Sequence, residues 1–261
     1  MDLSAARVLI TGASRGIGLE IARTLHAQGA TIIGTARSEA SIAAAVEELD
    51  MIPVVGDLND PVVADRVIDE ALTHGPIDVL INNAGIEIVG QVAEQDPDDL
   101  RAVIGVNLEV PITLAHHVLP HMLERGSGRI VNISSMASVV SSPGWATYSA
   151  SKAGLSSFSR SLKTELAGTG VGVTVVEIGF VQTDMLDDLR SNDFVKASFD
   201  RYKRLGLARI MAVDEVASAI ATAIEKERNH VRLPKRSIAM SMIANAPRRF
   251  AELVQKGVPT A

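Results

Sequence analysis

Short apolar runs alternate with longer helical patterns along the chain, and this alternation restricts the possible folds more than any other feature of the sequence. The runs are rich in β-branched residues and lie at Val8–Thr11, Thr31–Thr35, Ile52–Val55, Val79–Asn82, Ile130–Ser134, Val173–Ile178 and His230–Leu233. Helix-like stretches separate them at Ile17–Gln28, Ser41–Leu49, Pro61–Thr73, Asp98–Leu123, Ala146–Ala167 and Asp214–Lys226. Continuously apolar strands are typical of a parallel sheet that is covered on both faces. The sequence therefore predicts an α/β fold, a doubly wound (Rossmann) domain with a seven-stranded parallel sheet and helices on both faces.

A single domain spanning residues 1–261 explains the pattern best, because no linker rich in Pro, Gly or Ser divides the chain. Two segments fall outside the alternation. Residues 184–212 mix aromatic and charged side chains after the sixth strand, where we expect a lid over the substrate. Residues 235–261 lack a clear period, and we interpret them as a C-terminal extension.

The composition argues against several classes of protein. The chain has 25 Lys and Arg against 31 Asp and Glu, a net charge of −6 that disfavours binding to nucleic acid or to an anionic membrane. It contains no cysteine, so disulfides, thiolate nucleophiles and iron–sulfur clusters are excluded. No apolar run approaches the length of a membrane span, and the first residues are unlike a secretory signal. We therefore expect a cytoplasmic protein without stable membrane insertion.

A glycine-rich loop, Thr11-Gly-Ala-Ser-Arg-Gly-Ile-Gly18, joins the first strand to the first helix. Glycines at 12, 16 and 18 lack Cβ atoms, so the backbone N–H groups can approach a pyrophosphate closely. The N-terminus of the following helix adds its dipole and its unpaired N–H groups. In this position the loop predicts a dinucleotide site, and the alternative is an ordinary turn between a strand and a helix.

The end of the second strand bears on the choice of dinucleotide. It reads Gly34-Thr-Ala-Arg37-Ser38, without the carboxylate that usually binds the adenosine ribose hydroxyls of NAD. A guanidinium at Arg37 would instead bind the 2′-phosphate of NADP, and Arg15 could add a second positive charge. We therefore expect NADP (NADPH) rather than NAD. In the alternative, Arg37 is a solvated residue at the start of a helix.

Tyr148-Ser-Ala-Ser-Lys152 begins a helical pattern, and its tyrosine and lysine lie four residues apart on one face. An ammonium group beside a phenol favours the phenolate and lowers the phenol pKa from about 10. The pair therefore predicts a tyrosine that can exchange a proton near neutral pH.

Together these segments resemble the short-chain dehydrogenase/reductase family over roughly residues 7–183. The resemblance rests on Thr11-Gly12, Gly16-Ile17-Gly18, Asp57-Leu58, Asn82-Asn83-Ala84-Gly85, Asn107, Ile133-Ser134-Ser135 and Tyr148 with Lys152. It implies a hydride transfer between NADP(H) and a secondary alcohol, its ketone or an aldehyde.

The resemblance also implies the roles of the catalytic residues. Ser135 would orient the substrate oxygen, and Tyr148 would donate a proton to it or accept one from it. Lys152 would hold the nicotinamide ribose and lower the tyrosine pKa, while Asn107 would anchor a water that relays protons to Lys152. The loop motif and the resemblance together assign the cofactor site to Gly12, Ser14, Arg15, Gly16, Ile17, Gly18, Arg37, Asp57, Leu58, Asn83, Ala84, Gly85, Tyr148, Lys152, Gly179, Val181 and Thr183.

Two features depart from the family pattern. Ile178 occupies a position where relatives usually have proline, and this leaves the path of the following loop open. The last strand continues as Pro234-Lys-Arg rather than into an Asp-Gly-Gly segment. This departure disfavours a fatty-acid-synthesis reductase and the usual tetramer. We expect a homodimer or a homotetramer.

The substrate pocket is expected to be apolar, which favours a lipophilic carbonyl or alcohol substrate of steroid, retinoid or fatty type. Its expected residues are Val139, Val140, Trp145, Met185, Leu186, Leu189, Phe194, Val195 and Phe199. One alternative is a 3-oxoacyl reductase acting on an acyl-carrier or polyketide substrate. Others are an NADP-binding sensor without turnover and a structural oligomer. His117 and His121 are spaced as a metal pair but lack a third ligand, so no metal site is expected.

Overall fold

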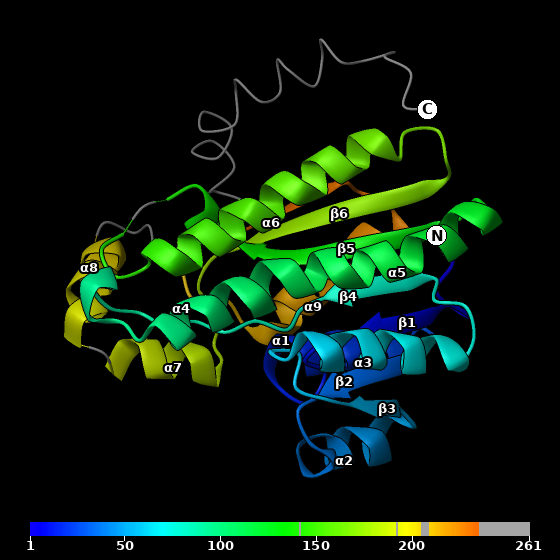
Figure 1. Cartoon of the computed structure of the whole chain (residues 1–261), viewed down its shortest axis with the longest axis horizontal. Helices are drawn as coiled ribbons and strands as arrows, with labels where there is room; N and C mark the ends of the chain where they lie inside the picture. Colours follow the sequence, from blue (N-terminus) through cyan, green and yellow to red (C-terminus); the bar gives the residue numbers. More distant parts are fainter. Residues whose placement is uncertain (141, 192, 205–208, 235–261) are drawn as a thin grey trace.

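The computed structural model describes residues 1–140, 142–191, 193–204 and 209–234 (Figure 1). The expected C-terminal extension at 235–261 lies outside the described residues, and so do the side chains of Phe194 and Val195.

A parallel sheet forms the centre of the molecule and confirms the predicted fold. Within the described residues it has seven strands in the order β3-β2-β1-β4-β5-β6-β7, and every pair is parallel. The strands are β1 (Arg7–Ile10), β2 (Thr31–Ala36), β3 (Ile52–Val55), β4 (Val79–Asn82), β5 (Gly128–Ser135), β6 (Val171–Ile178) and β7 (His230–Leu233). The strand order reverses between β1 and β4, which is where doubly wound sheets bind their ligands.

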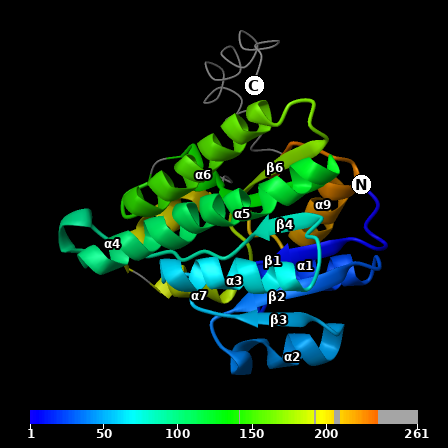
Figure 2. The same ribbon diagram turned by 45° about the vertical axis from the view of Figure 1, so that its right-hand side comes forward.

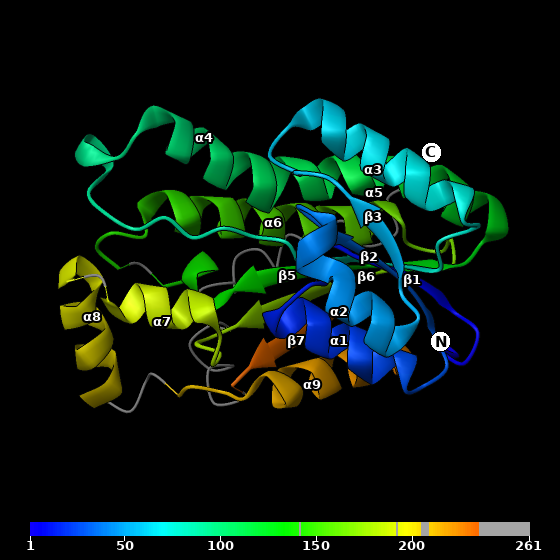
Figure 3. The same ribbon diagram turned by 90° about the horizontal axis from the view of Figure 1, so that it is seen from below.

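Helices cover both faces of the sheet, as Figure 3 shows. On one face α1 (Gly16–His26), α2 (Glu39–Leu49) and α9 (Val213–Glu225) bury their apolar sides against the strands. On the other face α3 (Pro61–Thr73), α5 (Val110–Arg125) and α6 (Ala146–Glu165) bury a second apolar cluster. Both faces of the sheet are thus buried under helices, as its continuously apolar strands predict.

A π-helical turn interrupts the long helix that the sequence predicts at Asp98–Leu123. The chain forms α4 (Pro97–Ile104), the π turn η2 (Gly105–Glu109) and then α5, with α4 and α5 following one another beside α6 (Figure 2). Pro111 has no N–H and so cannot complete the α-helical ladder there, which accounts for the wider turn. The turn contains Asn107, whose side chain bonds to the backbone of a neighbouring loop instead.

The helical stretch Pro97–Arg125 has the length and composition of a membrane span, although 44% of its most apolar window is buried inside the protein. A core helix of a water-soluble protein passes the same test, so this stretch is weak evidence for a membrane span.

Two helices lie beyond the carboxyl ends of the strands, in the segment where the sequence predicts a lid over the substrate (Figure 1). They are α7 (Asp184–Ser191) and α8 (Asp193–Arg204). Among their described side chains, Leu186, Leu189 and Phe199 are buried and pack with Trp145 in a small cluster of their own. Most of the other residues in these helices are polar or charged, so the helices do not stand out as apolar stretches in the sequence.

A buried carboxylate ties the last two strands to α6. Glu177 of β6 is 0% exposed, and its oxygens lie 2.6 Å from Arg232 Nε, 3.0 Å from His230 Nε2 and 3.5 Å from Arg160 Nη1. Burial alone would raise the pKa of Glu177, but the hydrogen bonds and charges of His230 and Arg232 lower it to about 2. The next residues, Ile178 and Gly179, lead directly into the site described below.

We expect Glu177→Ala to lower the free energy of unfolding by about 3–5 kcal/mol, because it removes the shared carboxylate from buried cations. Since the folded-state pKa lies near 2 and the unfolded value near 4.3, the stabilisation is present above pH 5 and lost as the pH falls toward 2. Urea unfolding at several pH values measures both effects. Glu70→Ala, which breaks the exposed pair with Arg66, is the control and should cost less than about 1 kcal/mol. Equal losses for the two variants would contradict the prediction.

Candidate active site

The loops that follow β1 and β4 are hydrogen-bonded to each other at the point where the strand order reverses. Thr11 Oγ1 accepts from the backbone N–H groups of Asn83 and Ala84, each at 3.0 Å. The Asn83 amide donates in return to the carbonyls of Thr11 at 2.9 Å and of Gly12 at 3.2 Å. Asn83 therefore holds the glycine-rich loop in place. Thr11, which the sequence analysis uses only as part of the motif, is its main partner.

The geometry of the glycine-rich loop fits a pyrophosphate. Gly12 and Gly16 have φ angles of +67° and +56°, the left-handed region that side chains disfavour. A Cβ on Gly18 would lie 2.1 Å from the Gly12 carbonyl oxygen, so only glycine lets α1 approach the loop so closely. The N-terminus of α1 has no side-chain cap, which leaves its first N–H groups for an anion.

The other predicted loop residues lie around this N-terminus. Ser14 is part of the loop, and Ile17 lines the pocket described below. Arg15 Nη1 lies 2.8 Å from Asp184 Oδ2, so it joins the loop to the first turn of α7. Its charge therefore already has a partner, which the sequence analysis does not predict.

The residues predicted for the adenosine end lie after β2 and β3. Arg37 is exposed and, among the described residues, its side chain forms neither a hydrogen bond nor an ion pair. Asp57 is also exposed, and its Oδ1 accepts from the Asn59 N–H at 3.0 Å. Leu58 is buried in the core beside α3. A cation and a carboxylate thus remain accessible at this edge.

The structure brings the four predicted catalytic residues to one place. Ser135 ends β5, Tyr148 and Lys152 lie in the first turns of α6, and Asn107 lies in the π turn. Lys152 Nζ is 5.9 Å from the centre of the Tyr148 ring and donates to the Ile133 carbonyl at 3.0 Å.

The Asn107 side chain is buried and fully engaged. Its amide donates to the Ile86 carbonyl at 2.9 Å and to Ser151 Oγ at 3.1 Å, and its oxygen accepts from the Ile86 N–H at 2.9 Å. Gly85 permits this close approach, because a Cβ there would lie 3.1 Å from Asn107 Oδ1 and 3.3 Å from Lys152 Nζ.

Ser134 and Ser135 have different surroundings, and only Ser135, to which the resemblance assigns the catalytic role, lines the pocket. Ser134 Oγ is buried and bonds to the Lys152 carbonyl at 2.9 Å and to Ser156 Oγ at 2.7 Å, so it fastens α6 to β5. Ser135 Oγ accepts from the Ala137 N–H at 3.1 Å and faces the pocket.

The predicted nicotinamide loop follows β6. Ile178, in place of the usual proline, completes β6 and pairs with both Ser135 and Leu233. The Gly179 N–H donates to the Leu233 carbonyl at 2.8 Å, and Val181 is buried and bridged to Met211. Thr183 Oγ1 donates to the Val181 carbonyl at 3.3 Å and lines the pocket. The loop path is therefore fixed by β7.

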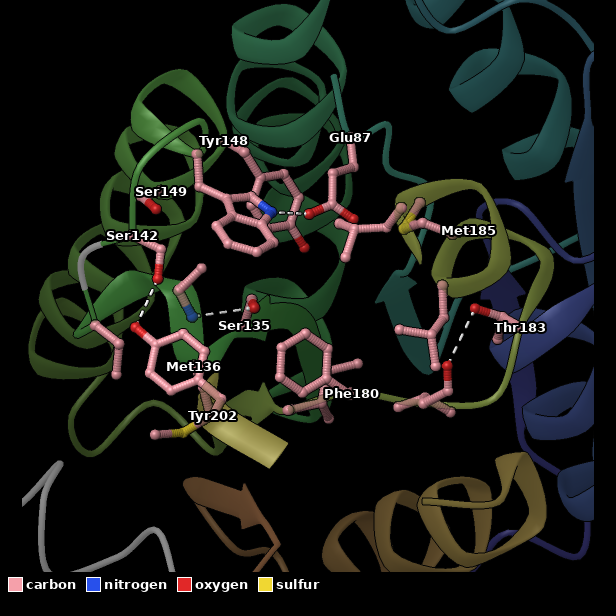
Figure 4. A pocket seen from close by; sticks show the side chains of 18 of the residues that line it. Glu87, Ser135, Met136, Ser142, Tyr148, Ser149, Phe180, Thr183, Met185 and Tyr202 are labelled. Carbon is pink, nitrogen blue, oxygen red and sulfur yellow. Dashed lines mark hydrogen bonds between the residues drawn. The ribbon is translucent and has the colours of Figure 1, made fainter. Parts of the chain in front are cut away.

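A pocket of about 240 Å³ opens beside Ser135 and Tyr148 (Figure 4). Its apolar walls include five of the residues in the predicted set, although Val139 is not one of them; Phe199 packs behind the wall. The apolar lining residues are Ile17, Met136, Ala137, Val140, Trp145, Ile178, Phe180, Val181, Met185, Leu186, Leu189 and Pro234. Opposite the catalytic end, Ser142 Oγ and the Tyr202 hydroxyl of α8 are hydrogen-bonded at 2.6 Å.

Glu87 also lines this pocket, and the sequence analysis misses it. Its carboxylate accepts a short hydrogen bond from the indole Nε1 of Trp145. The sequence offers one faint signal: Glu87 is a lone carboxylate between Ile86 and Ile88, in the segment that follows Gly85. Nothing in that spacing shows that the side chain turns inward.

Three ionisable groups in or beside the pocket, Glu87, Lys152 and Tyr148, have shifted pKa values. Burial raises the pKa of Glu87 to about 7, against the Trp145 hydrogen bond and the Lys152 charge. Burial lowers the pKa of Lys152 to about 8, although Glu87 opposes this.

For Tyr148, burial and then the Glu87 charge raise the pKa, while a hydrogen bond to Ser135 lowers it. In this structure the pKa of Tyr148 is therefore raised rather than lowered, and its lowering by Lys152, whose Nζ lies 5.9 Å from the ring centre, stays a prediction.

Comparisons with known proteins agree with this geometry. A family profile of the short chain dehydrogenases matches residues 6–193. The chain is 37% identical to the ketoacyl reductase HetN of Nostoc sp., covering 92% of this chain and 82% of that protein. It is 35% identical to the 3-oxoacyl-acyl-carrier-protein reductase of Salmonella typhimurium, covering 88% and 94%. A blue fluorescent protein from a metagenomic library, solved with NADPH, has a TM-score of 0.78 and 29% identity over 89% of this chain and 98% of its own.

The protonation of Glu87 can be read from Trp145, the single tryptophan of the chain. Because the pKa of Glu87 is raised to about 7, we expect tryptophan emission to change with a midpoint near pH 7 in a fluorescence titration. The change should vanish in Glu87→Gln, while a step from Lys152, whose pKa is lowered to about 8, can remain. A transition near pH 7 that persists in the glutamine variant would show that another group causes it.

Proposed function

The chain belongs to the short-chain dehydrogenase family, and we propose that it uses NADPH to reduce the carbonyl group of a lipophilic substrate. Family membership makes it an NAD(P)-dependent oxidoreductase that acts on alcohol and carbonyl groups, which confirms the prediction of an enzyme over a sensor or a structural oligomer. One observation carries the finer proposal: the largely apolar pocket opens directly onto Ser135 and Tyr148. A cytoplasmic location and a homodimer or homotetramer stay predictions.

The choice of NADPH rests on Arg37, an exposed guanidinium directly after β2 without a partner among the described residues. Arg15 would have to break its ion pair with Asp184 before it could also bind the 2′-phosphate of NADPH. Arg37 is therefore the main contact to this phosphate in the proposal. The uncapped N-terminus of α1 and the loop glycines would hold the pyrophosphate. The bound cofactor supplies the hydride, and the protein positions the substrate against it.

The protein's own part is to orient the carbonyl and to deliver a proton. The Ser135 hydroxyl would donate a hydrogen bond to the substrate oxygen, and the Tyr148 hydroxyl would transfer a proton to it as charge develops. Burial and the Glu87 charge raise the pKa of Tyr148, so the phenol is protonated at neutral pH and has a proton to transfer. As the family resemblance implies, Asn107 would anchor a water that relays protons to Lys152, and Lys152 would hold the nicotinamide ribose.

A 3-oxoacyl thioester is the second candidate substrate. Two similar relatives, a ketoacyl reductase and a 3-oxoacyl-acyl-carrier-protein reductase, favour it. A fatty 3-oxoacyl chain would also suit apolar walls such as Val140, Met185 and Leu186. Against it stands the sequence after β7, which lacks the Asp-Gly-Gly segment.

Carbonyl reduction is tested by NADPH consumption with a panel of small polar ketones, lipophilic ketones and 3-oxoacyl thioesters. Tyr148→Phe removes the proton donor but keeps the ring, so we expect turnover to fall at least about 100-fold, the usual scale of acid catalysis. Unchanged cofactor binding in this variant is the control. Turnover that survives in the phenylalanine variant would remove Tyr148 from the reaction.

The cofactor preference is tested by Arg37→Asp. We expect NADPH binding to weaken by at least about tenfold while NADH binding changes little, because a carboxylate repels the 2′-phosphate and suits a ribose hydroxyl. Titration of both cofactors against wild type and variant measures the change. Equal losses for NADPH and NADH would show that Arg37 does not contact the phosphate.

A further inference from the structure

We propose that Glu87 determines substrate specificity by accepting a hydrogen bond from a hydroxyl or ammonium group that the substrate carries in addition to its carbonyl. This inference rests on the proposed carbonyl reduction and adds a second polar contact to it. The substrate class is then a lipophilic ketone with a hydrogen-bond donor, and a ketone with a carboxylate at the same position is disfavoured.

The geometry leaves part of the Glu87 carboxylate available to a ligand. Figure 4 shows Glu87 pointing into the pocket beside Tyr148, with a hydrogen bond from the indole nitrogen to one oxygen. Among the described residues, Trp145 is its only hydrogen-bond partner, and it has no ion pair. The second oxygen thus has acceptor capacity that no protein group uses.

Trp145 positions this carboxylate. Its side chain is 6% exposed and packs with Leu186, Leu189 and Phe199 under the two helices that cover the pocket. Because the indole N–H has a fixed direction, it orients the Glu87 carboxylate to which it donates. The second acceptor therefore has a defined position relative to Tyr148.

An unsatisfied acceptor in largely apolar surroundings favours a ligand that supplies a donor. A substrate hydroxyl or ammonium group would satisfy it, whereas a purely apolar group would leave it desolvated without a partner. A carboxylate on the substrate would be repelled by ionised Glu87. Lys152 and Tyr148 are the other titratable groups that interact with Glu87, and both already have roles in the proposed reaction.

Arg209 is the other charged residue that lines the pocket, and it does not neutralise Glu87. Its Nη2 lies 2.8 Å from Glu215 Oε2, and its side chain is half exposed. Of the two charged residues that line the pocket, Glu87 is therefore the one without an ion pair among the described residues.

The test compares four ketones on one lipophilic scaffold: the plain ketone and its hydroxy, amino and carboxylate derivatives. They are reduced by wild type, Glu87→Gln, Glu87→Leu and a control, Tyr202→Phe, which removes the pocket hydroxyl that is hydrogen-bonded to Ser142 and leaves Glu87 in place. In wild type we expect kcat/KM to be higher for the hydroxy and amino ketones than for the plain ketone, and lowest for the keto acid.

Glutamine should keep the Trp145 bond through its oxygen and present an NH₂ donor to the ligand. We therefore expect Glu87→Gln to lower kcat/KM for the amino ketone and raise it for the keto acid, each by about tenfold relative to the plain ketone. Glu87→Leu should remove the preference for the hydroxy ketone, mostly through KM. In Tyr202→Phe the four ketones should keep the order of kcat/KM values that wild type shows.

A gain for the keto acid is a result that mere damage to the pocket would not give. If all four ketones change in parallel in both Glu87 variants, Glu87 has only a structural role and the inference is wrong. If the plain ketone is reduced by wild type while the order of the four is unaffected by the Glu87 variants, the inference fails and the proposed function stands.

Binding gives a readout that does not need turnover. In the Tyr148→Phe background, the emission of Trp145 reports ligand binding in the presence of NADP⁺, and the affinities of the four compounds should follow the same order. Weakened binding of the amino ketone on adding Glu87→Gln supports the inference even if none of the ketones is a substrate. Equal affinities for all four compounds in both backgrounds would overturn it.

Discussion

The hydrogen bonds between Thr11 and the loop after β4 are the contact on which the rest of the site depends. Neighbouring loops of a parallel sheet diverge where the strand order reverses, and a ligand can enter only if both loops keep their shape. Asn83 fixes the glycine-rich loop through the Thr11 and Gly12 carbonyls, while Gly85 lets Asn107 and Lys152 come close. One short segment after β4 therefore positions the cofactor loop on one side and the catalytic side chains on the other.

Much of this architecture follows from the sequence because it rests on local patterns. Apolar runs of the right length predict the strands, and the glycines at 12, 16 and 18 predict the loop, since backbone conformation and close packing demand them. The same reasoning fails where distant contacts decide the structure. The helices α7 and α8 are mostly polar and charged, so no apolar stretch marks them, and the Asn107 side chain in the π turn takes its place through contacts with the distant backbone at Ile86.

The shifted pKa values in the pocket could not be predicted from the sequence for a related reason. A tyrosine and a lysine four residues apart predict a lowered phenol pKa only if both stay near water. Here burial acts on both groups in the unfavourable direction, and Glu87 arrives from a loop more than fifty residues away in the chain. The chemistry of Tyr148 is thus set jointly by α6 and by the loop after β4.

Because of the π turn at Gly105–Glu109, the number of residues in this region sets the rotation of α5 about its own axis as well as its position along that axis. A π turn holds one residue more than an α-helical turn, so deleting that residue would turn everything after it by about 100° about the helix axis. The face of α5 that packs on the sheet, with Leu114, Val118 and Met122, would then point elsewhere. Evolution can therefore change side chains around Asn107 far more readily than it can add or remove a residue there.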